Sequence, residues 1–299
     1  MGAVVSPTVT VHGLVTGFPT GAATLAADVL VAAVTAAYAT LAIRTPRWPG
    51  WRAAAFVAGG VLVFVAVGSS VAAYARQDFS VHVVDYLVLA DVAPALVALG
   101  APVTLALRRA PPAMRRRIER VLGSRPAQAL THPVAAALLS YITLMVYFLT
   151  PLYPLSERNS AVLAAADAAF LVTGCLYWGT VVGVDPPLAR LSHPLRLLLL
   201  ASGIPVVSLV GLGLSTTHSS IDVAVHTVAD THRGGAILWG GGVLFLLVAS
   251  SVMFWLWSGY DRRVALLDDL RRDEELARRA DSLAGGTFGR RRPKPPSAA

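Results

Sequence analysis

Residues 79–109 read FSVHVVDYLVLADVAPALVALGAPVTLALRR, and this stretch decides the fold. Ser80 is a good helix cap, and the run after it stays largely apolar until the double arginine at Arg108 and Arg109. A helix of about 20 or more apolar residues is long enough to cross a bilayer with some tilt. The stretch therefore predicts a transmembrane helix.

The same helix carries polar residues at membrane depth. His82, Asp85 and Tyr86 lie within one turn, and at about 100° per residue they share one face of the helix. Asp91 falls on the opposite face by the same rule. An ionisable side chain inside a spanning helix costs free energy unless it is paired. These residues are therefore candidates for a functional site.

The composition supports a membrane protein. Of 299 residues, 55% are hydrophobic and 14% are charged, which is too apolar for a soluble chain of this size. The net charge of +8 lies in short loops and in the C-terminal tail, so topology explains it better than a nucleic-acid partner does. The partner that the composition implies is the lipid bilayer. Cys175 is the single cysteine, which excludes an internal disulfide and any Cys-x-x-Cys motif.

Seven apolar runs predict an all-α integral membrane protein, a bundle of seven transmembrane helices. The runs occupy residues 22–43, 53–75, 80–107, 132–150, 160–184, 195–214 and 234–257. We expect an external N-terminal segment at 1–21, a membrane domain at 22–258 and a charged tail at 259–299 whose end is disordered. Arginines concentrate after the first, third and fifth runs and in the tail. The N-terminus is therefore expected outside and the C-terminus in the cytoplasm.

This topology brings polar side chains from distant segments to one depth near the outer surface. We predict that they line one outward-facing pocket, with His82 as the principal metal ligand. The residues are His82, Asp85, Tyr86, Asp167 and Asp230. Histidine and carboxylate donors suit copper(II) or zinc, whereas copper(I) prefers sulfur or paired imidazoles. The alternative is that these groups only hydrogen-bond to one another.

Two connections near the same surface complete the expected site region. Residues 151–159, PLYPLSERN, are interpreted as a short external loop. Between the sixth and seventh runs, His218, Asp222, His226 and Asp230 are spaced by four, so a helix there would place them in one stripe. For His218 and His226 taken alone we favour solvated surface histidines. No nucleophile arrangement, phosphate loop or His-Glu-x-x-His motif is found, so the chain is not expected to be an enzyme.

Four stretches of the chain resemble a known family. They are RTPRWPGWRAAAFVAGG (44–60), AAYARQDFSVHVVDYLVLADVAPALVALGAPVTLALR (72–108), FLVTGCLYWGTVVGVDP (170–186) and DTHRGGAILW (230–239). Together they are similar to the CtaG-type cytochrome c oxidase assembly factors. The resemblance implies a multi-pass protein of the bacterial plasma membrane that aids copper insertion into the oxidase at the outer face, with oxidase subunits as partners.

The resemblance also implies ligand positions. In that family the third helix carries a His-x-x-x-His pair, which falls on His82 and Tyr86 here, and a histidine of the fifth helix falls on Asp167. An Asp-Gln start of the seventh helix falls on Asp230 and Thr231. Two imidazole positions thus hold oxygen donors, which bind copper(I) less well. A metal-free membrane scaffold and a small-solute or metal transporter stay open as alternatives.

Overall fold

The computed structural model describes residues 22–68, 78–185, 191–222 and 226–288. The expected external segment 1–21 and the end of the tail at 289–299 lie outside the described residues. All regular elements of the described residues are helical. They are α2 (Ala22–Arg44), α3 (Gly50–Gly68), α5 (Phe79–Leu87), η1 (Val88–Val92), α6 (Ala93–Leu99), α7 (Pro102–Arg109), α8 (Pro112–Leu122), α9 (Arg125–Leu130), α10 (Pro133–Leu149), α11 (Leu152–Arg158), α12 (Ser160–Val182), α13 (His193–Thr216) and α14 (Val228–Phe288).

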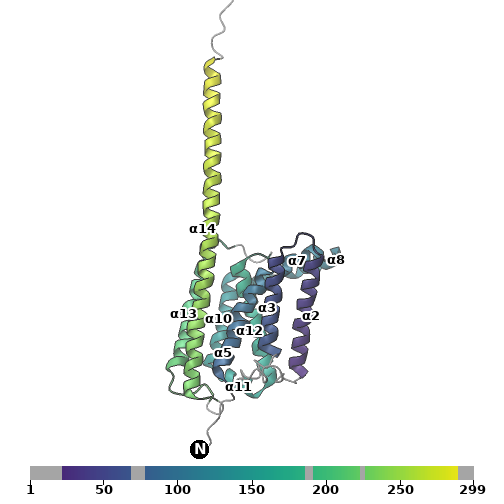
Figure 1. Ribbon diagram of the computed structural model, residues 1–299, viewed down its shortest axis with the longest axis vertical. Coiled ribbons are helices and arrows are strands. Elements are labelled where there is room, and N and C mark those ends of the chain that lie inside the picture. Colours follow the sequence, from purple (N-terminus) through teal and green to yellow (C-terminus); the bar gives the residue numbers. More distant parts are fainter. Residues whose placement is uncertain (1–21, 69–77, 186–190, 223–225, 289–299) are drawn as a thin grey trace, which may run out of the picture. The chain divides into compact units, whose positions relative to one another are not determined.

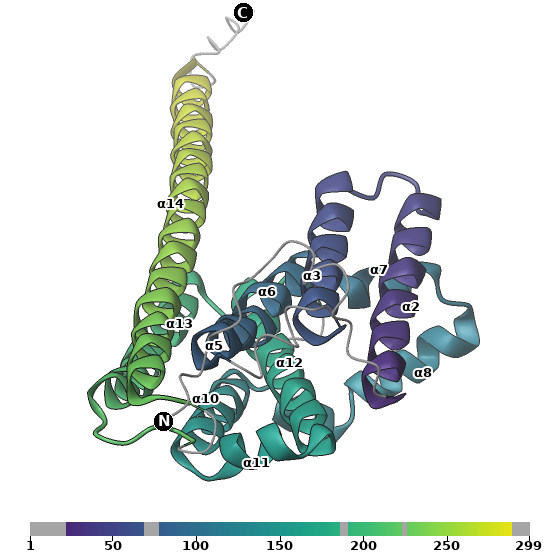
Figure 2. The same ribbon diagram turned by 60° about the horizontal axis from the view of Figure 1, so that its bottom comes forward.

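The chain divides into two compact units, Met1–Ser250 and Ser251–Ala299. The first unit is a helical bundle, in which α11 and the start of α14 lie at one end and α7 and α8 at the other (Figure 1). The third span, α5 to α6, occupies the middle, with α3 on one side and α12 on another (Figure 2). The second unit is helical from Ser251 to Phe288, where it continues α14.

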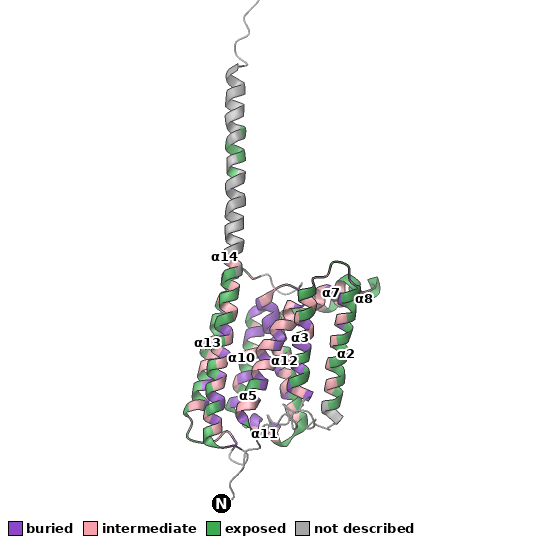
Figure 3. Cartoon of the chain, in the orientation of Figure 1, coloured by how far each residue is buried: buried purple, intermediate pink, exposed green. Residues whose placement is uncertain are grey.

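Six helical segments of the described residues are long and apolar enough to cross a membrane, or seven if the bent pair of α10 and α11 counts as one span. This confirms the predicted all-α membrane bundle. Exposed residues lie along the outward faces of the helices (Figure 3). Large apolar residues are among them, as lipid contact requires; Val29 is 68% exposed and Leu198 is 65% exposed. Which terminus lies outside the membrane stays a prediction.

The third span is less regular than the sequence predicts. A π-helical turn, η1, follows α5, and Ala101 adopts the left-handed region at φ 50° before α7 begins at Pro102. Proline lacks an N–H group and disfavours the helical conformation of the residue before it, so the helix stops at this point and starts again. The expected single helix over 80–107 is therefore interrupted once, at Ala101, and contains one π-helical turn before that break.

A carboxylate from a distant segment caps the restarted helix. Asp185, just after α12, accepts hydrogen bonds from the N–H groups of Val103 at 3.0 Å and Thr104 at 2.7 Å. It also accepts one from the Thr104 hydroxyl at 2.6 Å. The first N–H groups of a helix lack partners within the helix, so a buried start needs such an acceptor. The bond between Asp185 and α7 joins the third and fifth spans at the α7 end of the bundle.

Candidate functional site at the α11 end

The candidate site lies where α11 meets the ends of α5, α10 and α14. The connection expected to be a loop forms α11 instead, bent by 72° from α10. Tyr153, Ser156 and Glu157 stand at positions i, i+3 and i+4, so they share one face of this short helix. Tyr153 and Ser156 are buried. The bend at Pro151 therefore turns polar side chains into the bundle rather than toward water.

The first part of the site is built around His82. Its Nε2 atom lies 2.9 Å from the Tyr147 hydroxyl, and that hydroxyl lies 2.9 Å from Oγ of Ser156. Ser156 in turn donates to the backbone carbonyl of Tyr153 at 2.7 Å. The Nδ1 atom of His82 lies 4.0 Å from Glu157, the outer limit of an ion pair. His82 is only 7% exposed and Tyr147 only 1%, so one buried hydroxyl orients the imidazole.

The second part of the site joins α11 to the start of α14. The Tyr153 hydroxyl lies 2.8 Å from Nε2 of His226. The Nδ1 atom of the same imidazole lies 3.2 Å from Oδ2 of Asp230, a close contact outside hydrogen-bond geometry. Asp230 also accepts the N–H of Phe79 at 2.8 Å and the hydroxyl of Ser80 at 2.7 Å. One carboxylate therefore links His226 to the first turn of α5.

Aromatic rings connect the two parts. The ring of Tyr153 lies 5.0 Å from the His82 imidazole and 5.9 Å from the His226 imidazole, measured between centroids. Phe79 packs edge-on against Tyr153 at 5.1 Å. Such contacts hold rings in defined orientations. We call the set His82, Tyr147, Tyr153, Ser156, His226 and Asp230 the two-histidine cluster.

The helix that would place His218, Asp222, His226 and Asp230 in one stripe does not form in the described part of this segment. Residues 217–222 are not helical, residues 223–225 lie outside the described part, and α14 begins at Val228. His226 is 6% exposed, so the solvated interpretation favoured for it is wrong, whereas His218 is exposed. Asp222 is buried and pairs at 3.3 Å with Arg158 at the end of α11. Contacts with residues that are distant in the sequence thus hold this segment, and it is not helical.

The five predicted site residues separate into three environments. His82 and Asp230 belong to the two-histidine cluster. Asp85 is buried and lies close enough to Asp167 of α12 to interact with it electrostatically. Tyr86 packs edge-on against Phe148 at 5.3 Å and Phe170 at 4.7 Å. Their assignment to a single metal pocket stays a prediction.

Sequence reasoning missed four members of the cluster, namely Tyr147, Tyr153, Ser156 and His226. Tyrosines near the end of a spanning run are usually interface anchors, which hides a buried role. A signal was nevertheless present, because Tyr153, Ser156 and Glu157 follow Pro151 with helical spacing. That spacing favours a short helix with one polar face over a loop.

The imidazole donors at this end already have partners within the cluster. Among the residues that the structure describes, no group of three or more histidine, cysteine, aspartate or glutamate side chains is arranged to hold an ion. Each imidazole of the cluster already contacts a tyrosine hydroxyl. Cys175, the single sulfhydryl, is a free, half-buried residue of α12. Copper(I) prefers sulfur or paired imidazole donors, and copper binding at this end of the bundle stays a prediction.

Comparison with known proteins assigns the chain to a family. The model of the family described as cytochrome c oxidase caa3 assembly factors matches residues 32–259, which include the whole two-histidine cluster. The chain belongs to this family. The resemblance read from residues 44–60, 72–108, 170–186 and 230–239 is thereby confirmed.

Three curated proteins of mycobacteria are similar to this chain. Uncharacterized proteins of Mycobacterium bovis and Mycobacterium tuberculosis are 31% identical over 266 residues, a match that covers 83% of this chain and 40% of theirs. An uncharacterized protein of Mycobacterium leprae is 29% identical over 247 residues, covering 77% of this chain and 38% of its own. The chain thus spans about two fifths of the length of these curated relatives. No solved structure matches.

Within the family, the positions implied by the resemblance have defined surroundings here. Tyr86, where a second histidine is implied, packs against the aromatic rings described above. Thr231, where a glutamine is implied, is fully buried; its hydroxyl donates to the Thr227 carbonyl at 3.1 Å and accepts the N–H of Ile221 at 3.1 Å. The threonine therefore fastens the segment before α14 to the helix itself.

Proposed function

We propose that this chain aids the assembly of a cytochrome c oxidase as a non-catalytic factor of the bacterial plasma membrane. In this proposal it helps copper reach the oxidase at the outer face of the membrane. The observation that carries the proposal is the family match over residues 32–259. Multiple apolar helices fit the expected setting in a bilayer.

The distribution of arginines supports the outer face as the place of action. The connections at the α7 end contain Arg47 and the arginines of α8, whereas the α11 end has only Arg158 and Arg233 among the described residues. Positive charge is retained on the cytoplasmic side of a membrane. The two-histidine cluster then lies on the side opposite the cytoplasm, where the copper-bearing part of the oxidase is proposed to be loaded.

The imidazoles are the groups in the cluster best suited to copper. A factor that passes copper on must bind it and release it, so its ligands must exchange their existing partners. His82 and His226 each have one tyrosine hydroxyl as such a partner. The proposal therefore assigns transient copper contact to these two histidines.

Gene deletion and complementation test the proposed function. Deleting the gene in the native bacterium should lower oxidase activity and the copper content of the oxidase when copper is limiting, and wild-type protein should restore both. His82→Ala and His226→Ala should fail to restore them. His218→Ala is the matched control, because His218 is an exposed histidine at the same end. Normal oxidase in the deletion strain would refute the proposal.

A metal-free scaffold is the second candidate function. The observation that favours it is the lack of a three-residue metal-binding group among the described residues. Purified wild-type protein titrated with copper(I) separates the two candidates. Binding near one copper per chain that His82→Ala abolishes supports copper handling. Failure to bind copper, together with loss of assembled oxidase in the deletion strain, supports the scaffold.

A further inference from the structure

Asp91 lies near the middle of the membrane, away from the two-histidine cluster. It is twelve residues from Phe79, and at about 1.5 Å per residue this places it about 18 Å along a span that crosses about 30 Å of hydrocarbon. It stands in the π-helical turn η1. Such turns are rare and often occur at functional sites, because the extra residue redirects the side chains around it. The turn therefore distinguishes this position from the rest of the span.

The contacts of Asp91 do not compensate a negative charge. The indole Nε1 of Trp178 donates to Oδ1 of Asp91 at 3.1 Å, the one hydrogen bond to this carboxyl group among the described residues. Within that part of the chain Asp91 forms no ion pair. A carboxylate in hydrocarbon with a single donor is strongly disfavoured, and the usual result is that the group takes up a proton. The remaining oxygen still requires a polar neighbour.

Such a neighbour fits into a small cavity beside Asp91. The cavity has a volume of about 20 Å³, and its polar wall consists of Asp91, Tyr86, Ser140, Tyr141 and Tyr177. A cavity needs about 10–15 Å³ and several polar partners to hold one water molecule. This cavity meets both requirements, whereas it is too small for an organic ligand.

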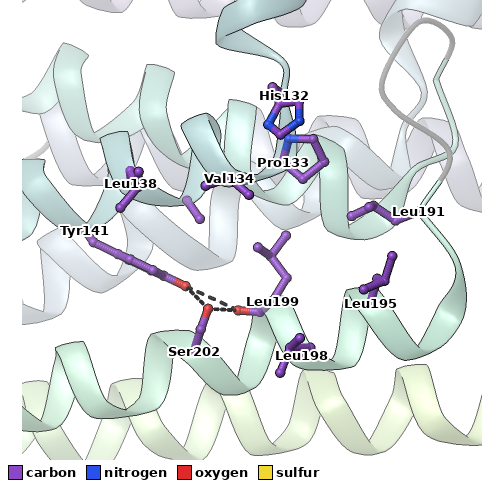
Figure 4. A pocket seen from close by; sticks show the side chains of 11 residues that line it. His132, Pro133, Val134, Leu138, Tyr141, Leu191, Leu195, Leu198, Leu199 and Ser202 are labelled. Atoms are coloured by element: carbon purple, nitrogen blue, oxygen red, sulfur yellow. Dashed lines mark hydrogen bonds between the residues drawn. The ribbon is translucent and has the colours of Figure 1, made fainter.

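Tyr141 connects the cavity to a groove on the side of the bundle. The groove lies between α10 and α13, has a volume of about 540 Å³ and includes Tyr141 and Ser202 in its wall. The two hydroxyls are 2.8 Å apart, and both point toward the carbonyl oxygen of Leu199, at 3.2 Å and 2.7 Å (Figure 4). The Tyr177 hydroxyl donates to the same carbonyl at 3.2 Å. Hydroxyl groups thus line the way from the cavity to the groove.

A second groove also has Asp91 in its wall. It lies between η1 and α14, has a volume of about 320 Å³ and is lined by apolar residues such as Leu87, Leu244 and Phe245. Among the described residues that line it, Asp91 alone is ionisable. An apolar reagent dissolved in the bilayer can therefore approach the carboxyl group.

We propose that Asp91 is a proton-binding site in the middle of the membrane, holding one water molecule together with Tyr141 and Tyr177. The proton exchanges along Tyr141 and Ser202 with the groove between α10 and α13. In this exchange the carboxyl proton passes to the water, and each oxygen of the route takes up one proton as it releases another. One proton leaves the site and Asp91 is left as the carboxylate until it is protonated again. The site is independent of the proposed copper function.

Infrared spectroscopy of the full chain in lipid vesicles tests the site. Wild-type protein should show a carbonyl band of a protonated carboxyl group that shifts in D₂O and is lost in Asp91→Asn, a variant that keeps an oxygen for Trp178. Tyr141→Phe should slow the deuterium exchange of this band by on the order of tenfold, equivalent to about 1.4 kcal/mol in the barrier. Tyr38→Phe is the matched control, because the Tyr38 hydroxyl bonds to the carbonyl of Gly100, which follows the end of α6 farther from Asp91.

Three results would overturn the proposal. The first is a spectrum that Asp91→Asn does not change, and the second is unaltered exchange in Tyr141→Phe. The third is a band that appears or disappears with sodium or potassium concentration, which would assign a metal cation to the cavity.

Labelling with a hydrophobic carbodiimide, which reacts with protonated carboxyl groups, gives a second measurement. It should modify Asp91 and leave Asp185 unmodified, and failure to modify Asp91 counts against the site.

Discussion

The carboxylate of Asp230, at the start of the last span, accepts the backbone N–H of Phe79, at the start of the third span, over 2.8 Å. These residues are 151 positions apart in the sequence. The bond supplies an acceptor to the first turn of α5, which helix geometry leaves without one. The same carboxylate contacts His226, so the position of the second imidazole and the start of the central helix depend on one side chain.

Replacing Asp230 should therefore weaken the bundle. Asp230→Ala is expected to lower the free energy of unfolding by about 1–3 kcal/mol, because the N–H of Phe79 and the hydroxyl of Ser80 lose this acceptor, while Asp78 still caps the helix. Asp230→Asn should lose less, because its amide oxygen still accepts a hydrogen bond. Thermal unfolding of the purified protein in detergent, followed by circular dichroism, measures both. A melting temperature of Asp230→Ala equal to that of the control His218→Ala would contradict this role.

Tyr147 should matter through its hydroxyl. Tyr147→Phe keeps the ring but leaves the buried His82 and Ser156 without this shared partner, which is expected to cost about 1–3 kcal/mol. The same thermal measurement applies to Tyr141→Phe as a comparison, because Tyr141 lies on the same helix α10 and its hydroxyl bonds to Ser202 of α13 instead. The ¹⁵N spectrum of the imidazole of His82 should also shift in Tyr147→Phe. An unshifted His82 signal would exclude the contact.

Asp185 should determine how firmly α7 is held. Asp185→Ala removes three hydrogen bonds to the first turn of α7, and we expect the backbone amides of Val103 and Thr104 to exchange with D₂O faster by about tenfold or more. Hydrogen exchange with mass spectrometry measures this directly. Peptides from α12 serve as the internal control and should be unaffected. Equal exchange in wild type and variant would show that the cap contributes little.

Gly211 should tolerate no side chain. An added Cβ would lie 2.7 Å from the backbone nitrogen of Trp239 and 2.9 Å from the carbonyl oxygen of Gly235, atoms of α14 that cannot move aside. Gly211→Ala is expected to destabilise the bundle by about 1–3 kcal/mol. Gly213→Ala is the matched control on the same helix, because its added Cβ would meet no atom within 4 Å. Similar melting temperatures for the two variants would argue against close packing of α13 on α14.

The spans were predictable from the sequence for a simple physical reason. The thickness of the bilayer sets the length of an apolar run, and polar backbone in hydrocarbon must be satisfied within a helix, so run length alone indicates where helices lie. The short stretch from Leu152 to Arg158 escaped this rule. It is too short to span, and its helical form depends on the bend that Pro151 introduces and on the packing of Tyr153 inside the bundle.

The site was predictable only in part. His82 and Asp230 were recognised because ionisable groups in spanning helices stand out against their neighbours. His226 was placed wrongly in solvent, since its burial depends on Tyr153, a residue 73 positions away that no local pattern connects to it. Tyr86 and Asp91 were assigned to opposite faces of one regular helix, yet both line the same small cavity. The π-helical turn between them changes the rotation per residue and brings them together.

The sequence by itself determined that this protein is an all-helical membrane bundle of its family, because hydrophobic length and short motifs are local properties of the chain. Only the tertiary structure decided which polar groups meet. The contacts between polar groups depend on the rotation of each helix about its axis, on the break at Ala101 and on the close approach of α13 and α14 at Gly211. Each of these results from packing many side chains at once, so no single stretch of residues contains it.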